Sequence, residues 1–220
     1  MPFTDPMADG SSVQLAGQRA LQAGATVSGV LKCVREIRSA SEIPVVLYTY
    51  LNPLLRYGVE VFERDAADAG VDGLLILDLP PEEDPNASRG NKKAIRQNPL
   101  RIHLIAPTTP EQRIAAIAAA ARGFIYYVSR EGVTGARDSI AESLEQKLTI
   151  IKQHTRLPIA VGFGISNSGQ AATVARVADA VVVGSAIVDL IGKIGDREDL
   201  ADRVGKFVLP IVDGIRSSRA

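Results

Sequence analysis

Cysteine and histidine are scarce in this chain of 220 residues, and charge of neither sign is in excess. Cys33 is the single cysteine, which excludes an internal disulfide and a cysteine-rich metal site. The two histidines, His103 and His154, lie far apart in the sequence, which argues against a histidine-based metal site or catalytic triad. Because 25 Lys and Arg balance 25 Asp and Glu, the chain does not carry the basic surplus that binds nucleic-acid phosphates.

Long apolar segments are also lacking. No apolar run approaches the roughly 20 residues that span a bilayer, and no leader of basic, then apolar, then small residues opens the chain. We therefore expect a cytoplasmic protein that binds neither membrane nor nucleic acid. The hydrophobic content of 46% and the charged content of 23% are ordinary for a soluble globular domain, so residues 1–220 are predicted to form a single domain.

Short apolar runs alternate with longer amphipathic stretches along the chain. The runs predict six strands, at residues 44–50, 73–78, 101–106, 123–128, 157–161 and 180–183. The stretches predict helices at 27–38, 59–69, 110–121, 143–154, 168–177 and 187–191, and a last helix whose apolar face runs from 200 to 215. Strands that are apolar throughout are typical of a parallel sheet covered by helices, so the fold class is α/β.

The chain opens in an unusual way for a strand–helix repeat. Residues 1–10 are rich in Pro, Asp and Gly and predict a loop, and nothing before residue 27 has the pattern of a strand. Thr26 is the expected N-cap of the helix at 27–38, and Gly70 the expected C-cap of the helix at 59–69. Cys33 is expected to be a small core residue of the first of these helices.

Glycine-rich loops follow the last three predicted strands, at residues 129–135, 162–166 and 184–186. Glycine lets a backbone approach a ligand closely, and free N–H groups at a helix start attract anions. The last two loops of a (β/α)₈ barrel are a known place for a phosphate. The plainer interpretation is that these glycines only make tight turns. Gly162-Phe163-Gly164 is not a dinucleotide fingerprint, because the Gly-x-x-Gly spacing into a helix is absent.

Several other polar residues have both a structural and a functional interpretation. Asp5 and Asp9 stand beside Pro or Gly, where a solvated turn is the ordinary role. Asp78, which precedes Glu82 and Glu83, ends a buried strand and either contacts a substrate or caps the next turn. His103 lies within a strand and is expected to be a satisfied core or edge residue. Of two adjacent tyrosines, Tyr126 and Tyr127, one should face each side of the sheet, and core packing is the default for both.

Seven loop segments together resemble one family, the tryptophan synthase alpha chain. They are PFTDPMADG at 2–10, YLNP at 50–53 with YG at 57–58, GVDG at 70–73 with DLPPEE at 78–83, APTTP at 106–110, YVSR at 127–130 with GVTGA at 132–136, GFGIS at 162–166 and GSAIV at 184–188. Residues 84–99 match the family poorly. The resemblance implies a (β/α)₈ barrel that cleaves indole-3-glycerol phosphate to indole and glyceraldehyde 3-phosphate, in a retro-aldol step of tryptophan biosynthesis.

The resemblance also implies which residues form the site. Asp9 would be the catalytic aspartate, whose charge stabilises the cationic indolenine formed when the ring carbon is protonated. Thr134 would lie near the loop that closes the site. Backbone groups expected to hold the phosphate belong to Gly135, Gly164, Gly184 and Ser185. Side chains expected to line the indole belong to Tyr48, Tyr126, Phe163 and Val182. No metal and no cofactor are expected in this subunit.

In the family, a glutamate a few residues before the Pro-Phe of the first loop is the general acid and base, and it would precede Pro2. The resemblance thus implies a barrel that is N-terminally truncated, with about six strands visible, and a 220-residue chain that is poorly stable and slow in indole release. It also implies a partner, the tryptophan synthase beta chain, which carries pyridoxal phosphate in an α2β2 heterotetramer. The alternative is an impaired or non-catalytic chain that only binds and activates this partner.

Overall fold

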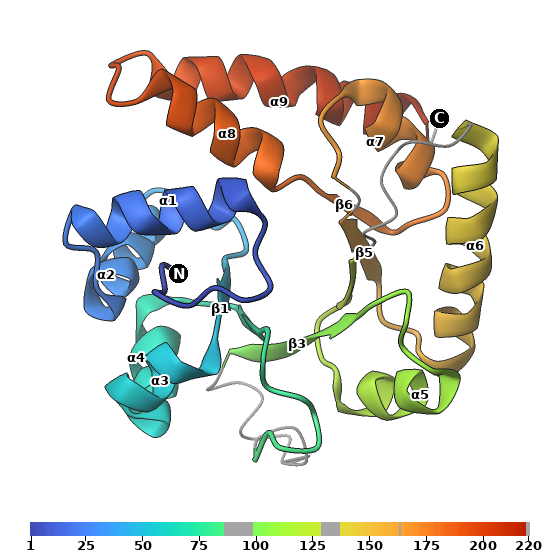
Figure 1. The fold of residues 1–220 in the computed structure, drawn as a ribbon, viewed down its shortest axis with the longest axis horizontal. Helices are drawn as coiled ribbons and strands as arrows, with labels where there is room; N and C mark the ends of the chain where they lie inside the picture. Colours follow the sequence, from blue (N-terminus) through green and yellow to red (C-terminus); the bar gives the residue numbers. More distant parts are fainter. Residues whose placement is uncertain (86–98, 129–136, 163, 219–220) are drawn as a thin grey trace. The chain divides into compact units, whose positions relative to one another are not determined.

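A computed structural model describes residues 1–85, 99–128, 137–162 and 164–218, in two compact units (Figure 1). Unit 1 is Met1–His103 with Ala120–Gly123, and unit 2 is Leu104–Ala119 with Phe124–Ala220. The prediction that residues 1–220 form a single domain stays a prediction. The strands found in the described part of the chain are β1 (Val46–Thr49), β2 (Gly73–Ile76), β3 (Leu100–Ile105), β4 (Ile125–Val128), β5 (Ile159–Gly162) and β6 (Ala180–Val182).

Helices separate the strands. Those found in the described residues are α1 (Ser11–Gln22), α2 (Val27–Arg38), α3 (Leu51–Tyr57), α4 (Val59–Ala69), α5 (Glu111–Ala120), α6 (Arg137–His154), α7 (Ser168–Ala175), α8 (Ser185–Ile194) and α9 (Leu200–Ser217). The sheet has the order β1-β2-β3-β4-β5-β6, which is the order of the chain. The pairs β1–β2, β2–β3, β4–β5 and β5–β6 are parallel. The six predicted strands and the α/β class are therefore confirmed.

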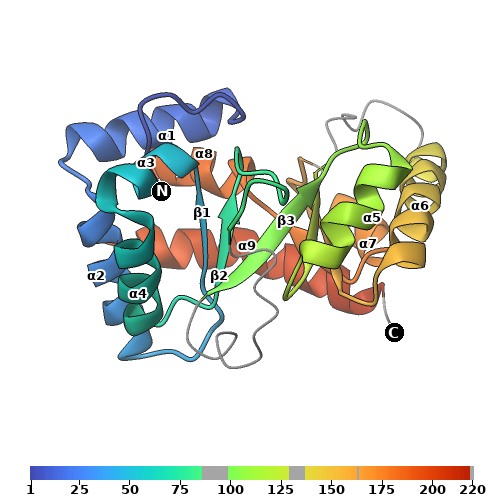
Figure 2. The same cartoon turned by 90° about the horizontal axis from the view of Figure 1, so that it is seen from below.

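Unit 1 has its core between β1–β2 and two helices. Figure 2 shows α2 and α4 side by side, on one side of these strands. Their apolar stripes supply Leu31 and Phe62, which are fully buried with Leu74 of β2. Thr26 caps α2 by accepting a hydrogen bond from the backbone N–H of Gly29, and Gly70 ends α4 with a left-handed φ of 88°. Both predicted caps are confirmed.

Both units use one device to align neighbouring parallel strands. Asp72, just before β2, accepts a hydrogen bond from the backbone N–H of Val45 at 2.7 Å and donates its own N–H to the Val45 carbonyl at 2.9 Å. Asp179, just before β6, makes the same two bonds with Ile159, at 2.9 and 3.1 Å. Each carboxylate satisfies an amide at the start of the neighbouring strand and so fixes the register.

Helix packing in unit 2 depends on a close approach of two backbones. Figure 1 shows α7 beside α9. A Cβ built on Gly214 of α9 would lie 2.7 Å from the carbonyl oxygen of Ser168, at the start of α7. No real side chain fits at this distance, so glycine is required for this contact.

Two short helices escaped the prediction from sequence. The start of α1 has neither a side-chain cap nor an acidic residue in its first turn, so the usual signals of a helix start are absent there. Helix α3 contains a proline at position 53, which in a sequence argues against a helix, although proline is tolerated in a first turn. Helices α6 and α8 are also longer than predicted, since they begin at Arg137 and Ser185.

The expectation that Cys33 is a core residue is wrong, because its side chain is exposed. The buried residues of α2 are Leu31 and Val34. At 100° per residue, Cys33 lies 200° around the helix from Leu31 and so faces away from the core.

A buried ionic cluster lies beside β3 in unit 1. Arg101 forms ion pairs with Glu63 of α4 and with Asp84, the latter at 2.8 Å, and all three side chains are at most 9% exposed. His103, two residues along β3, is 7% exposed. Within the described residues its Nε2 has no hydrogen-bond partner, so the expectation of a satisfied histidine is wrong. Burial lowers the pKa of the His103 imidazole, which favours its neutral form.

Across the described parts of the chain, no helix combines the length and the apolar character that a membrane span requires.

Candidate functional site

The loop that precedes α1 brings Asp9 to β1 in unit 1. The hydroxyl of Tyr48 donates a hydrogen bond to Asp9 Oδ1 at 3.1 Å. The two predicted site residues of this unit therefore meet, although 39 residues separate them in sequence. Asp9 is partly buried and Tyr48 is 36% exposed, so this carboxylate is oriented by the protein and still open to a ligand.

Residues next to Asp9 hold the loop in place. The backbone N–H of Ala8 donates to the Tyr50 hydroxyl at 2.9 Å, and the Gln14 side-chain amide donates to the Asp9 carbonyl at 2.9 Å. Tyr50 is 2% exposed and packs against Phe3, with ring centroids 5.4 Å apart. Burial raises the pKa of the Tyr50 phenol, which keeps it neutral. Prediction from sequence missed both residues: Tyr50 acts on a residue 42 positions away, and the contact of Gln14 with the Asp9 carbonyl, five positions away, follows no periodic pattern.

Asp78 has a structural partner. Its Oδ1 accepts a hydrogen bond from the backbone N–H of Leu51 at 2.7 Å, at the first residue of α3. The N-cap residue of α3, Tyr50, provides no side-chain cap, so the Asp78 carboxylate satisfies a helix N-terminus from the neighbouring strand end. Asp78 thus caps α3 and not the turn that follows Asp78 itself.

Unit 2 contains a cavity of about 340 Å³ at the ends of its strands. The lining residues come from β4, from the loop after β5, and from β6 with the start of α8: Tyr126, Val128, Gly162, Gly164, Ile165, Ser166, Val182, Gly184, Ser185, Ala186 and Asp189. Five predicted site residues meet here, namely Tyr126, Gly164, Val182, Gly184 and Ser185. Residues from the ends of β4, β5 and β6 therefore converge on one cavity.

The start of α8 suits this cavity to an anion. Gly184 is the N-cap, and its carbonyl accepts the N–H groups of Ile187 and Val188 at 3.0 and 3.2 Å. The N–H groups of Ser185 and Ala186 precede the first helical hydrogen bond and are available to a ligand. The helix dipole adds a favourable potential for negative charge. No Lys or Arg stands among the described lining residues, and the one charged side chain there is Asp189.

The two tyrosines of β4 face opposite sides, as predicted. Tyr127 is 3% exposed and belongs to the core, whereas Tyr126 lines the cavity. Core packing is therefore the role of Tyr127 alone. Burial raises the pKa of the Tyr126 phenol, so this ring presents a neutral hydroxyl. A Cβ built on Gly162 would overlap that hydroxyl and would lie 2.9 Å from the ring carbon Cε2.

Gly162→Ala is expected to push the Tyr126 ring into the cavity and to weaken phosphate binding by roughly tenfold, which corresponds to about 1.4 kcal/mol. The matched control is Gly205→Ala, because a Cβ on Gly205 meets nothing within 4 Å and Gly205 does not line the cavity. Titration calorimetry with inorganic phosphate measures the effect, and thermal unfolding checks that both variants fold. Equal phosphate affinity of the two alanine variants would contradict this account of Tyr126.

Three predicted site residues, Thr134, Gly135 and Phe163, lie outside the described residues.

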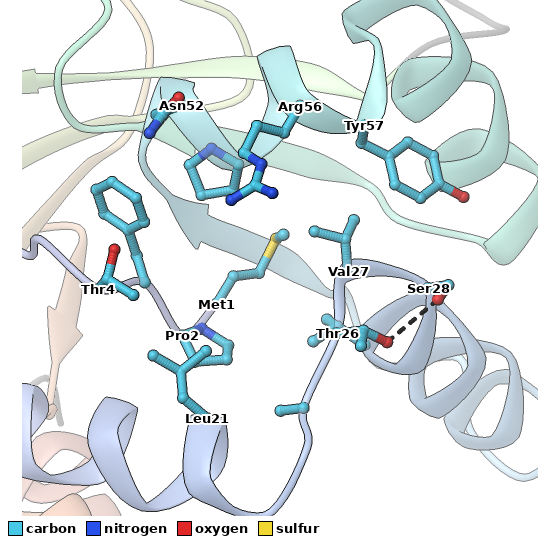
Figure 3. A pocket seen from close by; sticks show the side chains of 14 residues that line it. Met1, Pro2, Thr4, Leu21, Thr26, Val27, Ser28, Asn52, Arg56 and Tyr57 are labelled. Atoms are coloured by element: carbon cyan, nitrogen blue, oxygen red, sulfur yellow. Dashed lines mark hydrogen bonds between the residues drawn. The ribbon is translucent and has the colours of Figure 1, made fainter.

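A second cavity, of about 410 Å³, lies within unit 1 and is shown in Figure 3. Its walls come from residues 1–4, from the link between α1 and α2, and from α3, and Arg56 is its one charged lining side chain among the described residues. Asp9 and Tyr48 do not line it. No Asp, Glu or His stands among its described lining residues, so it shows no pair of acid and base groups and we do not place the reaction there.

Within the described residues, no group of three or more His, Cys, Asp or Glu is placed to hold a metal ion. The groups available for chemistry at the predicted site residues are thus the oriented carboxylate of Asp9 in unit 1 and the backbone amides at the start of α8 in unit 2.

Comparison with known sequences gives one consistent result. The profile of the family described as tryptophan synthase alpha chain matches residues 1–211. The tryptophan synthase alpha chain of Opitutus terrae is 48% identical over 217 residues, which cover 98% of this chain and 80% of that relative. The protein of the same name from Geotalea uraniireducens is 47% identical, over 99% of this chain and 80% of its own length.

Solved structures agree. Tryptophan synthase subunit alpha from Legionella pneumophila is 34% identical, with a TM-score of 0.84 over 99% of this chain and 80% of that one. A chain of the tryptophan synthase α2β2 complex from Pyrococcus furiosus is 37% identical, with a TM-score of 0.85 over 96% of this chain and 84% of that one. With six parallel strands that alternate with helices, this similarity confirms the predicted (β/α)₈ fold class.

Proposed function

The chain belongs to the tryptophan synthase alpha chain family, and we propose that it cleaves indole-3-glycerol phosphate to indole and glyceraldehyde 3-phosphate. This retro-aldol step needs a proton on the indole ring carbon that bears the glycerol chain. The bond between that carbon and the chain then breaks, its electron pair restores the indole, and the neighbouring hydroxyl loses its proton to become the aldehyde. Family membership makes the chain a lyase homologue of tryptophan biosynthesis.

The cavity of unit 2 is the observation that carries this proposal. It joins free amides at the start of α8 to the apolar Val182 and the neutral Tyr126. Such a combination suits a phosphate ester with an attached organic group. We assign the backbone of Gly164, Gly184 and Ser185 to the phosphate.

Asp9 would act on the indole. Protonation of the ring carbon leaves a positive charge on the ring nitrogen, and a fixed carboxylate lowers the energy of that cation. The hydrogen bond from Tyr48 to Asp9 Oδ1 at 3.1 Å fixes the direction of the carboxylate, so little reorganisation is needed when charge develops. Tyr48 and Val182 would contact the indole side of the substrate. We propose no metal and no cofactor for this subunit, and a cytoplasmic location.

We also propose that the chain pairs with a pyridoxal-phosphate β chain, which would take up the indole. The similar chain from Pyrococcus furiosus belongs to a complex described by mutual activation. Addition of this chain to a β subunit is expected to raise the rate of tryptophan formation from serine and indole. A chain that activates the β subunit but binds no indole-3-glycerol phosphate would support the non-catalytic alternative.

Substitutions at the N-cap of α8 test the proposed phosphate site. Gly184→Asp places a carboxylate in the cavity, so phosphate binding is expected to fall by more than about tenfold, and thermal unfolding checks that the variant folds. Gly184→Ala is the matched control. The ligand is indole-3-propanol phosphate, which has no glycerol hydroxyls and cannot undergo the retro-aldol step. Unchanged affinity in Gly184→Asp would refute the assignment of the phosphate to this cavity.

A further inference from the structure

An acidic side chain stands at the cavity that we assign to a phosphate. Asp189 lies on α8, four residues after Ser185, so the two residues share one face of the helix. Both line the cavity. We propose that Asp189 limits the affinity of the cavity for phosphate, so that inorganic phosphate and the sugar-phosphate product are held weakly. This inference rests on the proposed function.

No ion pair neutralises Asp189 in the part of the chain that the structure describes. Its side chain is exposed, and neither an ion pair nor a hydrogen bond of its carboxylate is found among the described residues. No Lys or Arg is found among the described lining residues of the cavity. A phosphate at the free amides of Ser185 and Ala186 is therefore attracted by the helix dipole and repelled by this carboxylate.

Weak phosphate binding has a consequence for turnover. Substrate and product carry the same phosphate group, so binding energy from that group stabilises both and does not favour the transition state. A carboxylate that reduces the binding energy of the phosphate group would therefore speed product release. Asp189→Asn would keep the shape of the side chain and remove the repulsion.

The test compares the dissociation constants of inorganic phosphate and glycerol 3-phosphate in the 220-residue chain. Asp189→Asn is expected to tighten both by about three- to tenfold at low ionic strength, and by less when salt screens the charge. Asp189→Glu, which restores the charge, is expected to resemble the wild type. Asp196→Asn is the control, because it removes an exposed carboxylate of the same unit that does not line the cavity.

Each outcome decides the inference. Equal affinity of Asp189→Asn and the wild type, with binding still lost in Gly184→Asp, would overturn the role of Asp189 and leave the phosphate site intact. An equal gain in Asp196→Asn would show a general effect of net charge and would also overturn it. If neither the wild type nor any variant binds phosphate, the phosphate site itself is refuted and the inference fails with it. A gain confined to Asp189→Asn that declines with salt supports it.

Discussion

Arg101→Met is expected to lower the free energy of unfolding by about 3–5 kcal/mol. Arg101 is paired with Glu63 and Asp84, and the exposed fractions of the three side chains are 9%, 9% and 1%. Methionine has a similar length but no charge, so the substitution leaves two carboxylates in an environment that disfavours them. Urea denaturation followed by circular dichroism measures the loss.

Arg64→Met is the matched control on the same unit. Arg64 pairs with Asp65 at 3.0 Å, but its side chain is 66% exposed, so water screens the interaction and the expected loss is at most about 1 kcal/mol. A loss below 1 kcal/mol for Arg101→Met would show that the carboxylates find other partners or water. A triple variant, Arg101→Met with Glu63→Gln and Asp84→Asn, removes all the charges and is expected to recover part of the stability.

The strands could be predicted from the sequence because burial on both faces of a parallel sheet makes them apolar throughout. Strands β2 and β5 are buried at every position, and each was predicted within a few residues. Helix α1 could not be predicted in the same way, because its start has neither a side-chain cap nor an acidic residue in the first turn.

The ionic cluster was beyond sequence reasoning for a different reason. Arg101 stands at the start of a predicted strand, Glu63 within an amphipathic helix, and Asp84 in a stretch that matched no pattern. Only the packing of α4 against β3 brings the first two together. Charged residues that pair over 38 positions leave no periodic signal. Whether Nε2 of His103 finds a hydrogen-bond partner likewise depends on which residues pack around it, and the sequence alone does not identify them.

The candidate site was predicted in part. Glycines after successive strands pointed to the cavity of unit 2, since free amides at strand ends are a local property. Asp189 was missed, although its spacing of four residues from Ser185 places both on one helix face. Tyr50 could not be found, because its partner Ala8 lies 42 residues away. Local chemistry is thus visible in the sequence, and support from a distant residue is not.

Asp9→Asn is expected to lower the rate of indole release by about 10²- to 10³-fold, the loss typical of one preorganised stabilising group. Asparagine keeps the shape of the side chain and can still accept the hydrogen bond from Tyr48. It removes the negative charge that would face the cationic ring. The measurement is kcat for indole release by the protein with and without the substitution.

Two further variants separate charge from structure. Asp5→Asn neutralises an exposed carboxylate of the same loop, which accepts a hydrogen bond from Thr4, and is expected to leave kcat of the uncomplexed chain unchanged. Tyr48→Phe removes the hydrogen bond to Asp9 but keeps the charge, so its effect should be only a fewfold loss. The affinity for indole-3-propanol phosphate should change little in Asp9→Asn, because the neutral indole of the ground state gains little from the charge. A fall in that affinity as large as the fall in kcat would mean that Asp9 binds the ground state, and its role as a stabiliser of the cation would be wrong.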